Sequence, residues 1–280
     1  MSINKILVPL DGSELASKAL PSALSIARRI DAQLCLVTVA TGKAGDLAGN
    51  DSESYLDAIS RSIVESGVSC CFHVTTGDAA ASIARIAGDE HADLIVMTTR
   101  GRSGIARGIL GSVTDELISE SAVPVYVTRA DNVAAEVGVE EYDSGVIVPL
   151  DGSELAVTAL DDAIHLAKSL VAPLYLLRVI DEDSSFAENV SAKTYLDRIS
   201  AQLAKRKVFA IPELLVGDPG ESIIRSMSNH PGSIVVMSTR GSGGLIRWVR
   251  GSVSDWLIQR APGPVVVSPH QTELLGSVIH

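Results

Sequence analysis

The chain has 280 residues, of which 46% are hydrophobic and 20% charged, and its formal net charge is -11. This is the balance of a globular protein, and the length favours two domains. The negative charge argues against a nucleic acid or an anionic membrane surface as partner, because both require a cationic face. The first apolar run is broken by Pro9 and is too short for a signal peptide or a spanning helix, so we expect a cytoplasmic protein.

Short β-branched apolar runs alternate with segments of helical period, which is typical of βαβ units and a parallel sheet. In the first half, the predicted strands are Lys5–Val8, Leu34–Val39, Ser69–Val74, Leu94–Met97 and Val125–Val127. In the second half, they are Val146–Pro149, Leu174–Val179, Val208–Leu215, Ile234–Met237 and Val265–Val267. We therefore predict an α/β protein of two tandem Rossmann-like modules. Each module is an open five-stranded parallel sheet in the order 3-2-1-4-5, with helices on both faces. The predicted domains are residues 1–130 and 145–280, joined by an acidic linker at 131–144.

The segment after the first strand has an apolar stripe of helical period, and the second half repeats the stripe. Pro21 lies inside the first copy of this helix, where it removes a backbone donor. Its counterpart in the second copy is Asp161, which keeps the donor. We therefore predict a disturbed helix in the first half and an uninterrupted one in the second.

A whole domain is duplicated with an offset of 140 residues, because the same motifs recur from the first strand to the last helix. The sequence VPLDGSEL occurs at 8–15 and again at 148–155. The pair Gly77-Asp78 returns as Gly217-Asp218, and MTTRG at 97–101 returns as MSTRG at 237–241. We therefore expect two pseudo-symmetric sites.

The repeated motifs fall at the carboxyl ends of strands one and four, where open parallel sheets bind ligands. The segment after strand four combines glycines, arginines and the start of a helix near Ser112. Glycine lets the backbone approach a ligand, and the free amides of a helix start attract anions such as phosphate. Charge-assisted hydrogen bonds to phosphate could come from Arg100, Arg102, Arg107, Arg240, Arg247 and Arg250.

Structural interpretations stand beside these functional ones. Ser112 with Asp115, Ser252 with Asp255, and Asp11 with Glu14 could each be a capping box, which requires no ligand. The six histidines are mostly unmatched between the halves, so we assign none of them a catalytic role. The three cysteines have no CxxC or His/Cys spacing, which predicts reduced structural thiols without a zinc site.

Together, PLDGSE after a strand, Gly-Asp before the third helix and a glycine followed after nine residues by Gly-Ser resemble the universal stress protein family. The resemblance covers both halves: Gly101 with Gly111-Ser112, and Gly241 with Gly251-Ser252. The ATP-binding members of that family have one more glycine, where this chain has Thr98 and Ser238.

The resemblance implies an ATP site in each half. Asp11 and Asp151 would contact ribose or a Mg²⁺-bound phosphate, and they are the metal candidates. The residues implied to border adenine are Pro9, Val39, Pro149 and Val179. Those implied to hold phosphates are Thr98, Thr99, Arg100, Gly101, Gly111, Ser112, Val113, Ser238, Thr239, Arg240, Gly241, Gly251, Ser252 and Val253. The family also associates through its last strand, so Val125–Val127 and Val265–Val267 would pair within one chain, and the chain could further form a homodimer.

Three functions follow from these observations. The first is a nucleotide-sensing stress protein that binds ATP with Mg²⁺ and has no catalytic residues, so that any hydrolysis is slow, because the sequence lacks a Walker lysine. The second is a dimerising scaffold of the same fold without nucleotide, for which Thr98 and Ser238 are the main evidence. The third is a nucleotide-dependent enzyme, which the fold alone does not exclude. No GxGxxG follows the first strand, and this argues against the enzyme.

Overall fold

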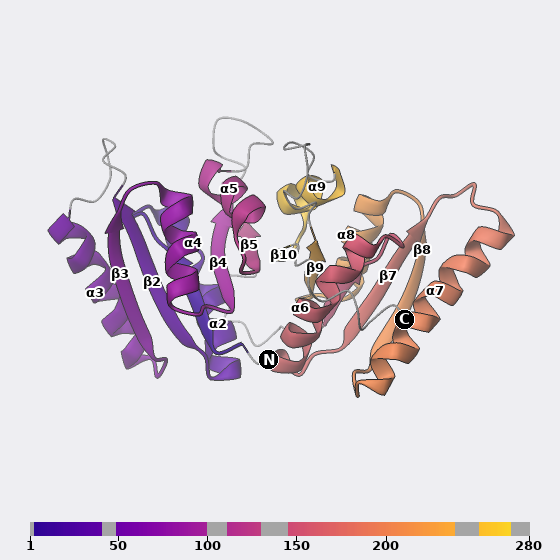
Figure 1. Ribbon diagram of the computed structural model, residues 1–280, viewed down its shortest axis with the longest axis horizontal. Coiled ribbons are helices and arrows are strands. Elements are labelled where there is room, and N and C mark those ends of the chain that lie inside the picture. Colours follow the sequence, from indigo (N-terminus) through magenta and orange to yellow (C-terminus); the bar gives the residue numbers. More distant parts are fainter. Residues whose placement is uncertain (1–2, 41–48, 100–110, 130–144, 239–251, 270–280) are drawn as a thin grey trace. The chain divides into compact units, whose positions relative to one another are not determined.

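The computed structural model describes residues 3–40, 49–99, 111–129, 145–238 and 252–269 (Figure 1). The chain divides into two compact units, residues 1–140 (unit one) and 141–280 (unit two), which we describe separately. The predicted linker at 131–144 lies outside the described residues, so the domain bounds stay a prediction. Within the described residues, no helix is long and apolar enough to cross a membrane.

Unit one contains one parallel sheet in the predicted order, β3-β2-β1-β4-β5. Its strands are β1 (Lys5–Pro9), β2 (Gln33–Ala40), β3 (Cys70–Thr76), β4 (Leu94–Thr99) and β5 (Val125–Arg129). Its helices are α1 (Glu14–Ser17), α2 (Leu20–Ile30), α3 (Gly49–Glu65), α4 (Ala79–Asp89) and α5 (Ser112–Glu120).

Unit two repeats this arrangement, with its strands in the order β8-β7-β6-β9-β10. The strands are β6 (Val146–Pro149), β7 (Leu174–Ile180), β8 (Ala210–Val216), β9 (Ile234–Ser238) and β10 (Val265–Ser268). The helices are α6 (Glu154–Leu170), α7 (Phe186–Lys205), α8 (Pro219–Asn229) and α9 (Ser252–Arg260). The predicted fold class is therefore confirmed.

The strand order determines which helices share a face of each sheet. Crossover connections between parallel strands are right-handed. In unit one the chain steps outward from β1 to β3 and then returns to β4 and β5, so α2 and α3 cover one face and α4 and α5 the other (Figure 1). The direction reverses between β1 and β4, and this switch point is where a doubly wound sheet opens a crevice for a ligand.

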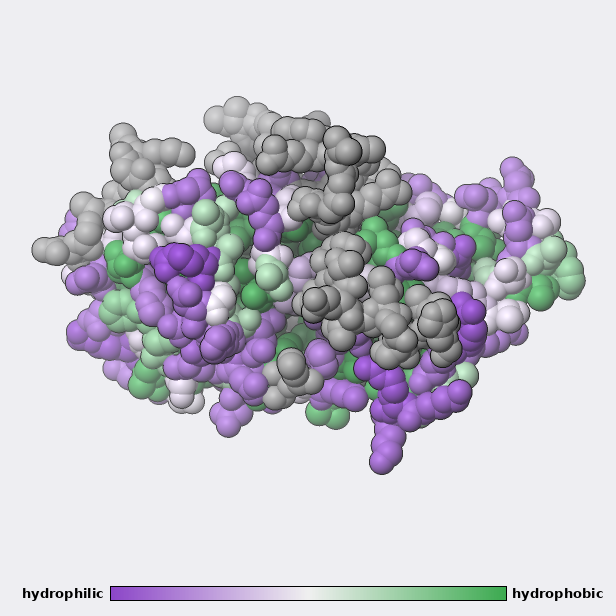
Figure 2. Space-filling view, in the orientation of Figure 1, coloured by the Kyte–Doolittle hydropathy of each residue, from purple (hydrophilic) through white to green (hydrophobic). Residues whose placement is uncertain are grey.

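Apolar residues from the strands and inner helix faces form each core. The first sheet buries β-branched and leucine residues such as Ile6, Leu36 and Ile95, all with no exposed area, and Tyr126 is its largest fully buried side chain. The face of the molecule in Figure 2 is largely hydrophilic over the helices, with scattered apolar residues. The strand ends of each unit are thus supported by a packed apolar core.

The predicted asymmetry of the first helix is confirmed. In unit one the helix is divided into α1, which ends at Ser17, and α2, which has Pro21 in its first turn. In unit two, α6 runs without interruption from Glu154 to Leu170, with Asp161 in the middle. The cause is the missing amide hydrogen of Pro21, since every residue of a helix interior must donate to the carbonyl four residues before it.

Candidate functional site

The turn after the first strand has the same two backbone-to-side-chain bonds in both units. Asp11 Oδ1 accepts a hydrogen bond from the Ser13 amide at 2.9 Å, and Ser13 Oγ accepts one from the Ala16 amide at 3.0 Å. The equivalent bonds of Asp151 and Ser153 measure 2.9 and 3.1 Å. Ser13 and Ser153 are the helix N-caps, so the capping box of Asp11 with Glu14 is wrong.

This turn leaves the aspartate exposed at the switch point. One oxygen of the Asp11 carboxylate bonds the Ser13 amide, and the side chain as a whole is exposed. Gly12, between Asp11 and Ser13, has a φ of 82°, a left-handed conformation that residues other than glycine rarely adopt. The LDGS sequence therefore holds a carboxylate at the carboxyl end of β1, where a ribose hydroxyl or a metal ion could approach it.

A hydroxyl connects the end of the fourth strand to the first helix in both units. Thr98 Oγ1 donates to the Leu15 carbonyl at 2.8 Å, and Ser238 Oγ donates to the Leu155 carbonyl at 2.7 Å. These are the residues that replace the first glycine of the nucleotide-binding pattern. Their hydroxyl groups connect the end of β4 to α1 and the end of β9 to α6. In this chain, the residues that replace the glycine therefore have a structural role.

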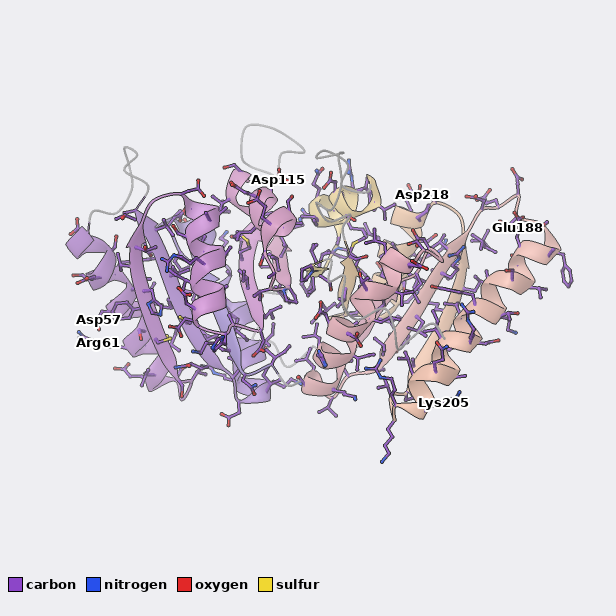
Figure 3. All side chains as sticks on the ribbon, in the orientation of Figure 1. Asp57, Arg61, Asp115, Glu188, Lys205 and Asp218 are labelled. Atoms are coloured by element: carbon purple, nitrogen blue, oxygen red, sulfur yellow. The ribbon has the colours of Figure 1, made fainter. Side chains whose placement is uncertain are left out.

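Helix α5 begins where the phosphate groups are expected, and no side chain within the described residues caps it. Its N-cap is Gly111, and Ser112 is the first helical residue, so the capping box of Ser112 with Asp115 is wrong. Figure 3 shows Asp115 in the first turn of α5, and Asp218 at the start of α8.

Five other helices among the described residues begin with a side-chain cap. The N-cap side chains of α1, α4, α6, α7 and α8 each accept a backbone hydrogen bond, and they belong to Ser13, Asp78, Ser153, Ser185 and Asp218. Helix α2 has no such cap, but it follows α1 after two residues. Helix α5 thus differs from these five helices, because its start has no side-chain cap. An anion could serve as the cap there.

The residues predicted to border adenine lie at the carboxyl edge of the sheet. Strands β1 and β2 pair in parallel, with Pro9 opposite Val37, and Val39 is the next residue but one. Both Pro9 and Val39 are half-buried, as are Pro149 and Val179 in unit two. Thr99, the last residue of β4, is buried, and Val113 and Val253 are half-buried in the first turns of α5 and α9.

Several predicted residues cannot be placed. Those outside the described residues are Arg100, Gly101, Thr239, Arg240, Gly241 and Gly251, together with Arg102, Arg107, Arg247 and Arg250. Ser252 is the first residue of α9. The structure therefore brings together the strand ends, the aspartate turn and the α5 start, while the phosphate loops stay a prediction.

The two units differ at one residue beside the site, which the sequence reasoning did not identify. In unit one, Thr38 Oγ1 donates to the Leu10 carbonyl at 2.7 Å. The equivalent residue in unit two is Arg178, whose Nη1 donates to the Leu150 carbonyl at 3.2 Å. This guanidinium also covers Gly152: a Cβ atom on that glycine would lie 2.7 Å from Arg178 Nη1. Arg178 therefore occupies space over the turn that carries Asp151.

The equivalent tyrosines of the two units, Tyr55 and Tyr195, differ in their hydrogen bonding. Tyr55 Oη in unit one is 3.2 Å from Ser17 Oγ. In unit two the equivalent pair is Tyr195 and Val157, and the buried Tyr195 Oη has no hydrogen-bond partner among the described residues. Burial raises the pKa of Tyr195. A residue-by-residue comparison of the halves at the 140-residue offset shows both substitutions and could have identified this difference.

The topology and the site together define the class of protein. Each unit is a doubly wound α/β module whose aspartate turn, hydroxyl bridge and helix start meet at the switch point. The family model of the universal stress proteins matches residues 2–129 and again 145–269. The chain belongs to the universal stress protein family, with one family domain in each half.

Individual relatives agree with this assignment. A universal stress protein of Mycobacterium tuberculosis is 26% identical over 187 residues, which are 63% of this chain and 62% of the relative. One from Methanocaldococcus jannaschii is 30% identical over 138 residues, covering 45% of this chain and 81% of the relative. The crystal structure of a universal stress protein from Archaeoglobus fulgidus has a TM-score of 0.76 at 22% identity, with 97% of this chain and 100% of that chain covered. The last likeness shows the fold.

Proposed function

We propose that this protein is a cytoplasmic nucleotide-sensing stress protein that binds ATP with Mg²⁺ at the switch point of each unit and hydrolyses it slowly or not at all. The observation that carries the proposal is the start of α5. It lies beside the end of β4, it begins with a glycine, and no described side chain caps it, whereas five other helices of the chain have such caps. A phosphate group would give the amides of this helix start an acceptor.

The aspartate turn supports the same ligand. Asp11 and Asp151 are exposed at the carboxyl ends of β1 and β6, with one carboxylate oxygen fixed by a serine amide. An oriented carboxylate accepts hydrogen bonds from a ribose or binds Mg²⁺ on a phosphate. The half-buried Pro9 and Val39 offer an apolar edge to adenine.

The unit-two site is proposed to be the weaker one. Its turn is covered by the Arg178 guanidinium, which is bonded to the Leu150 carbonyl, whereas unit one has the smaller Thr38 there. A nucleotide that uses Asp151 must displace or accommodate that guanidinium. Occupancy of the two sites would then follow ATP concentration over a wider range than two equal sites allow.

Association of the protein is part of the proposal. The last strand of each unit, β5 and β10, lies at the end of its own sheet's order beyond β4 and β9. Such an edge exposes unpaired backbone groups. We propose that the two last strands pair within the chain, and that a homodimer can form in addition.

The experiment is nucleotide retention measured together with turnover. The full chain is incubated with ATP and Mg²⁺ and desalted, the retained nucleotide is identified, and phosphate release is measured in parallel. Retention without turnover is expected. Rapid release of phosphate would favour the enzyme, while neither retention nor a thermal shift with any adenine nucleotide would favour the scaffold.

A further inference from the structure

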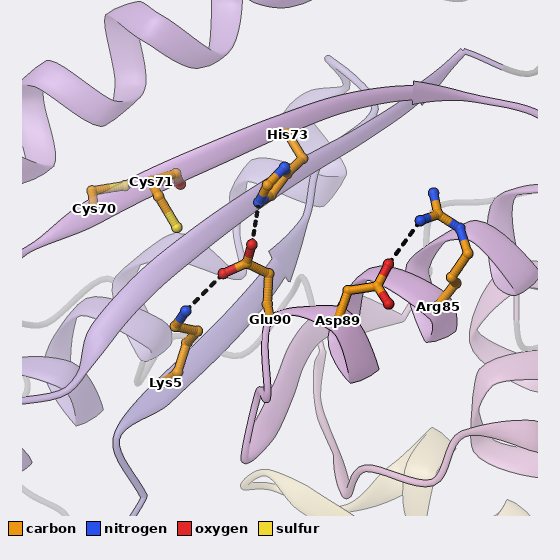
Figure 4. Close-up of polar contacts among 7 residues, drawn as sticks. All are labelled: Lys5, Cys70, Cys71, His73, Arg85, Asp89 and Glu90. Atoms are coloured by element: carbon orange, nitrogen blue, oxygen red, sulfur yellow. Dashed lines mark hydrogen bonds and ion pairs between the residues drawn. The ribbon is translucent and has the colours of Figure 1, made fainter.

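Four side chains with metal-binding atoms meet in unit one, away from the switch point. They are Cys35 on β2, Cys71 and His73 on β3, and Glu90 directly after α4. One ligand atom of each lies within 4.8 Å of the ligand atoms of the other three. In Figure 4, Cys71 and His73 point toward Glu90, and Cys70 points away.

The sheet register explains why the sequence does not reveal this cluster. Cys35 pairs with Cys71 across the parallel strands β2 and β3, so their side chains leave the same face of the sheet. His73 follows Cys71 by two residues and therefore projects on that face as well, whereas Cys70 projects on the other. No CxxC spacing is involved, so our expectation of no zinc site rested on spacing alone.

The cluster is anchored on one side by a lysine. Glu90 Oε2 is 2.7 Å from Lys5 Nζ, and Glu90 Oε1 is 2.8 Å from His73 Nε2. That His73 nitrogen is shielded from solvent and has no well-directed hydrogen bond among the described residues. Cys35 is completely buried, and the other three residues are half-buried. A buried imidazole nitrogen thus faces two sulfur atoms and a carboxylate oxygen.

The donor set selects the kind of metal. Two sulfurs, one imidazole nitrogen and one carboxylate oxygen suit zinc and do not suit magnesium or calcium, which take oxygen ligands. Zinc-ligand bonds of roughly 2.0–2.3 Å place tetrahedral ligands about 3.3–3.8 Å apart. Ligand atoms up to 4.8 Å apart therefore need to close by about 1 Å, while His73 Nε2 and Glu90 Oε1, now 2.8 Å apart, need to separate by about 0.5 Å.

The charges and the outer partner also fit a divalent ion. With two thiolates and one carboxylate, zinc would leave one negative charge, which Lys5 balances. Lys5 bonds only Oε2 of Glu90, so it would orient the carboxylate and leave Oε1 for the metal.

We propose that Cys35, Cys71, His73 and Glu90 form a four-ligand zinc site that joins β2, β3 and the end of α4 in unit one. Four protein ligands close the coordination shell, which is the arrangement of structural rather than catalytic zinc. The equivalent positions of unit two do not make such a set, because they hold Tyr175, Ile211, Glu213 and His230. There the Tyr175 and His230 rings stack at a centroid distance of 4.0 Å. The site is independent of nucleotide binding.

The test is zinc binding by the full chain, reduced and stripped with a chelator, in competition with a chromophoric chelator. Wild type and the control C70S are expected to bind one zinc ion per chain. C71S and H73Q are expected to bind zinc at least about 100-fold more weakly than the wild type, because each lacks one ligand. Each variant is first checked for a native circular dichroism spectrum.

Two further measurements on the wild type keep the proposal testable if a variant fails to fold. Zinc should slow the reaction of Cys71, but not of Cys70, with a thiol reagent, since Cys35 is already shielded by burial, and cobalt(II) should give thiolate-to-metal charge-transfer absorption. Equal zinc binding by wild type and folded C71S would overturn the proposal, as would equal reactivity of all three thiols with and without zinc. A reduced chain that binds no zinc but oxidises to a Cys35–Cys71 disulfide would also overturn it, in favour of a redox pair.

Discussion

Removing the Thr98 hydroxyl tests whether the bridge between β4 and α1 stabilises the switch point. In T98V the side chain keeps its shape and loses only the donor to the Leu15 carbonyl, a bond of 2.8 Å at a residue that is 9% exposed. The Leu15 carbonyl keeps a 3.3 Å bond from the Lys18 amide, so losing one of its two donors costs about 0.5–1.5 kcal/mol. For a unit of this size, that predicts a melting temperature lower by about 2–5 °C.

The assay is scanning calorimetry of the full chain, with ATP titration of the same samples. T98S keeps the hydroxyl and serves as the matched control, and S238A and S238T form the equivalent pair in unit two, where the bond is 2.7 Å. We expect the hydroxyl-free variants to melt earlier and to bind ATP less tightly in their own unit, because the aspartate turn loses its connection to β4. Equal melting temperatures and ATP affinities for T98V and T98S would refute the reasoning.

Three other predictions concern differences between the halves. R178T, which gives unit two the threonine of unit one, is expected to tighten its ATP binding about tenfold, or about 1.4 kcal/mol; calorimetric titration that finds unchanged or weaker binding would show that the guanidinium does not obstruct the site. D161P is expected to break α6 and to lower the unfolding free energy by about 3 kcal/mol, whereas D161A, which loses only the 3.2 Å ion pair with Arg206, should cost less than about 1 kcal/mol in denaturant titrations; equal effects would contradict the role given to Pro21. Burial raises the pKa of Asp162 from 3.8 to about 6, so the folded state binds the proton more tightly, and stability should fall between about pH 4 and pH 6 by up to about 3 kcal/mol. D162N should flatten that slope, and a D162N profile as steep as that of the wild type over this interval would contradict the prediction.

The duplicated fold could be predicted almost completely from the sequence. All ten strands lie where β-branched runs stand, and the observed strands mostly extend the predicted ones by one or two residues, as from Lys5–Val8 to Lys5–Pro9. The split first helix was also predictable, because the effect of Pro21 is local. Periodicity and backbone chemistry act over a few residues, so a single sequence contains that information.

The parts of the site that escaped prediction depend on contacts between distant segments. The capping boxes at Asp11 and Ser112 were wrong because the helices begin one to two residues away from where the motif placed them. The bond from Thr98 to the Leu15 carbonyl spans 83 residues, and a motif that records only a missing glycine cannot show it. The cluster of Cys35, Cys71, His73 and Glu90 requires the register of β2 and β3, which sequence spacing does not contain.

The most direct test of ATP binding at both switch points is calorimetric titration of the full chain with Mg²⁺-ATP. The samples are wild type, D11N, D151N and the double variant; asparagine keeps the oxygen that accepts from the Ser13 or Ser153 amide and removes only the charge. We predict two sites in the wild type, the loss of the tighter one in D11N, the loss of the weaker one in D151N, and no binding in the double variant. A double variant that binds ATP as the wild type does would contradict the account.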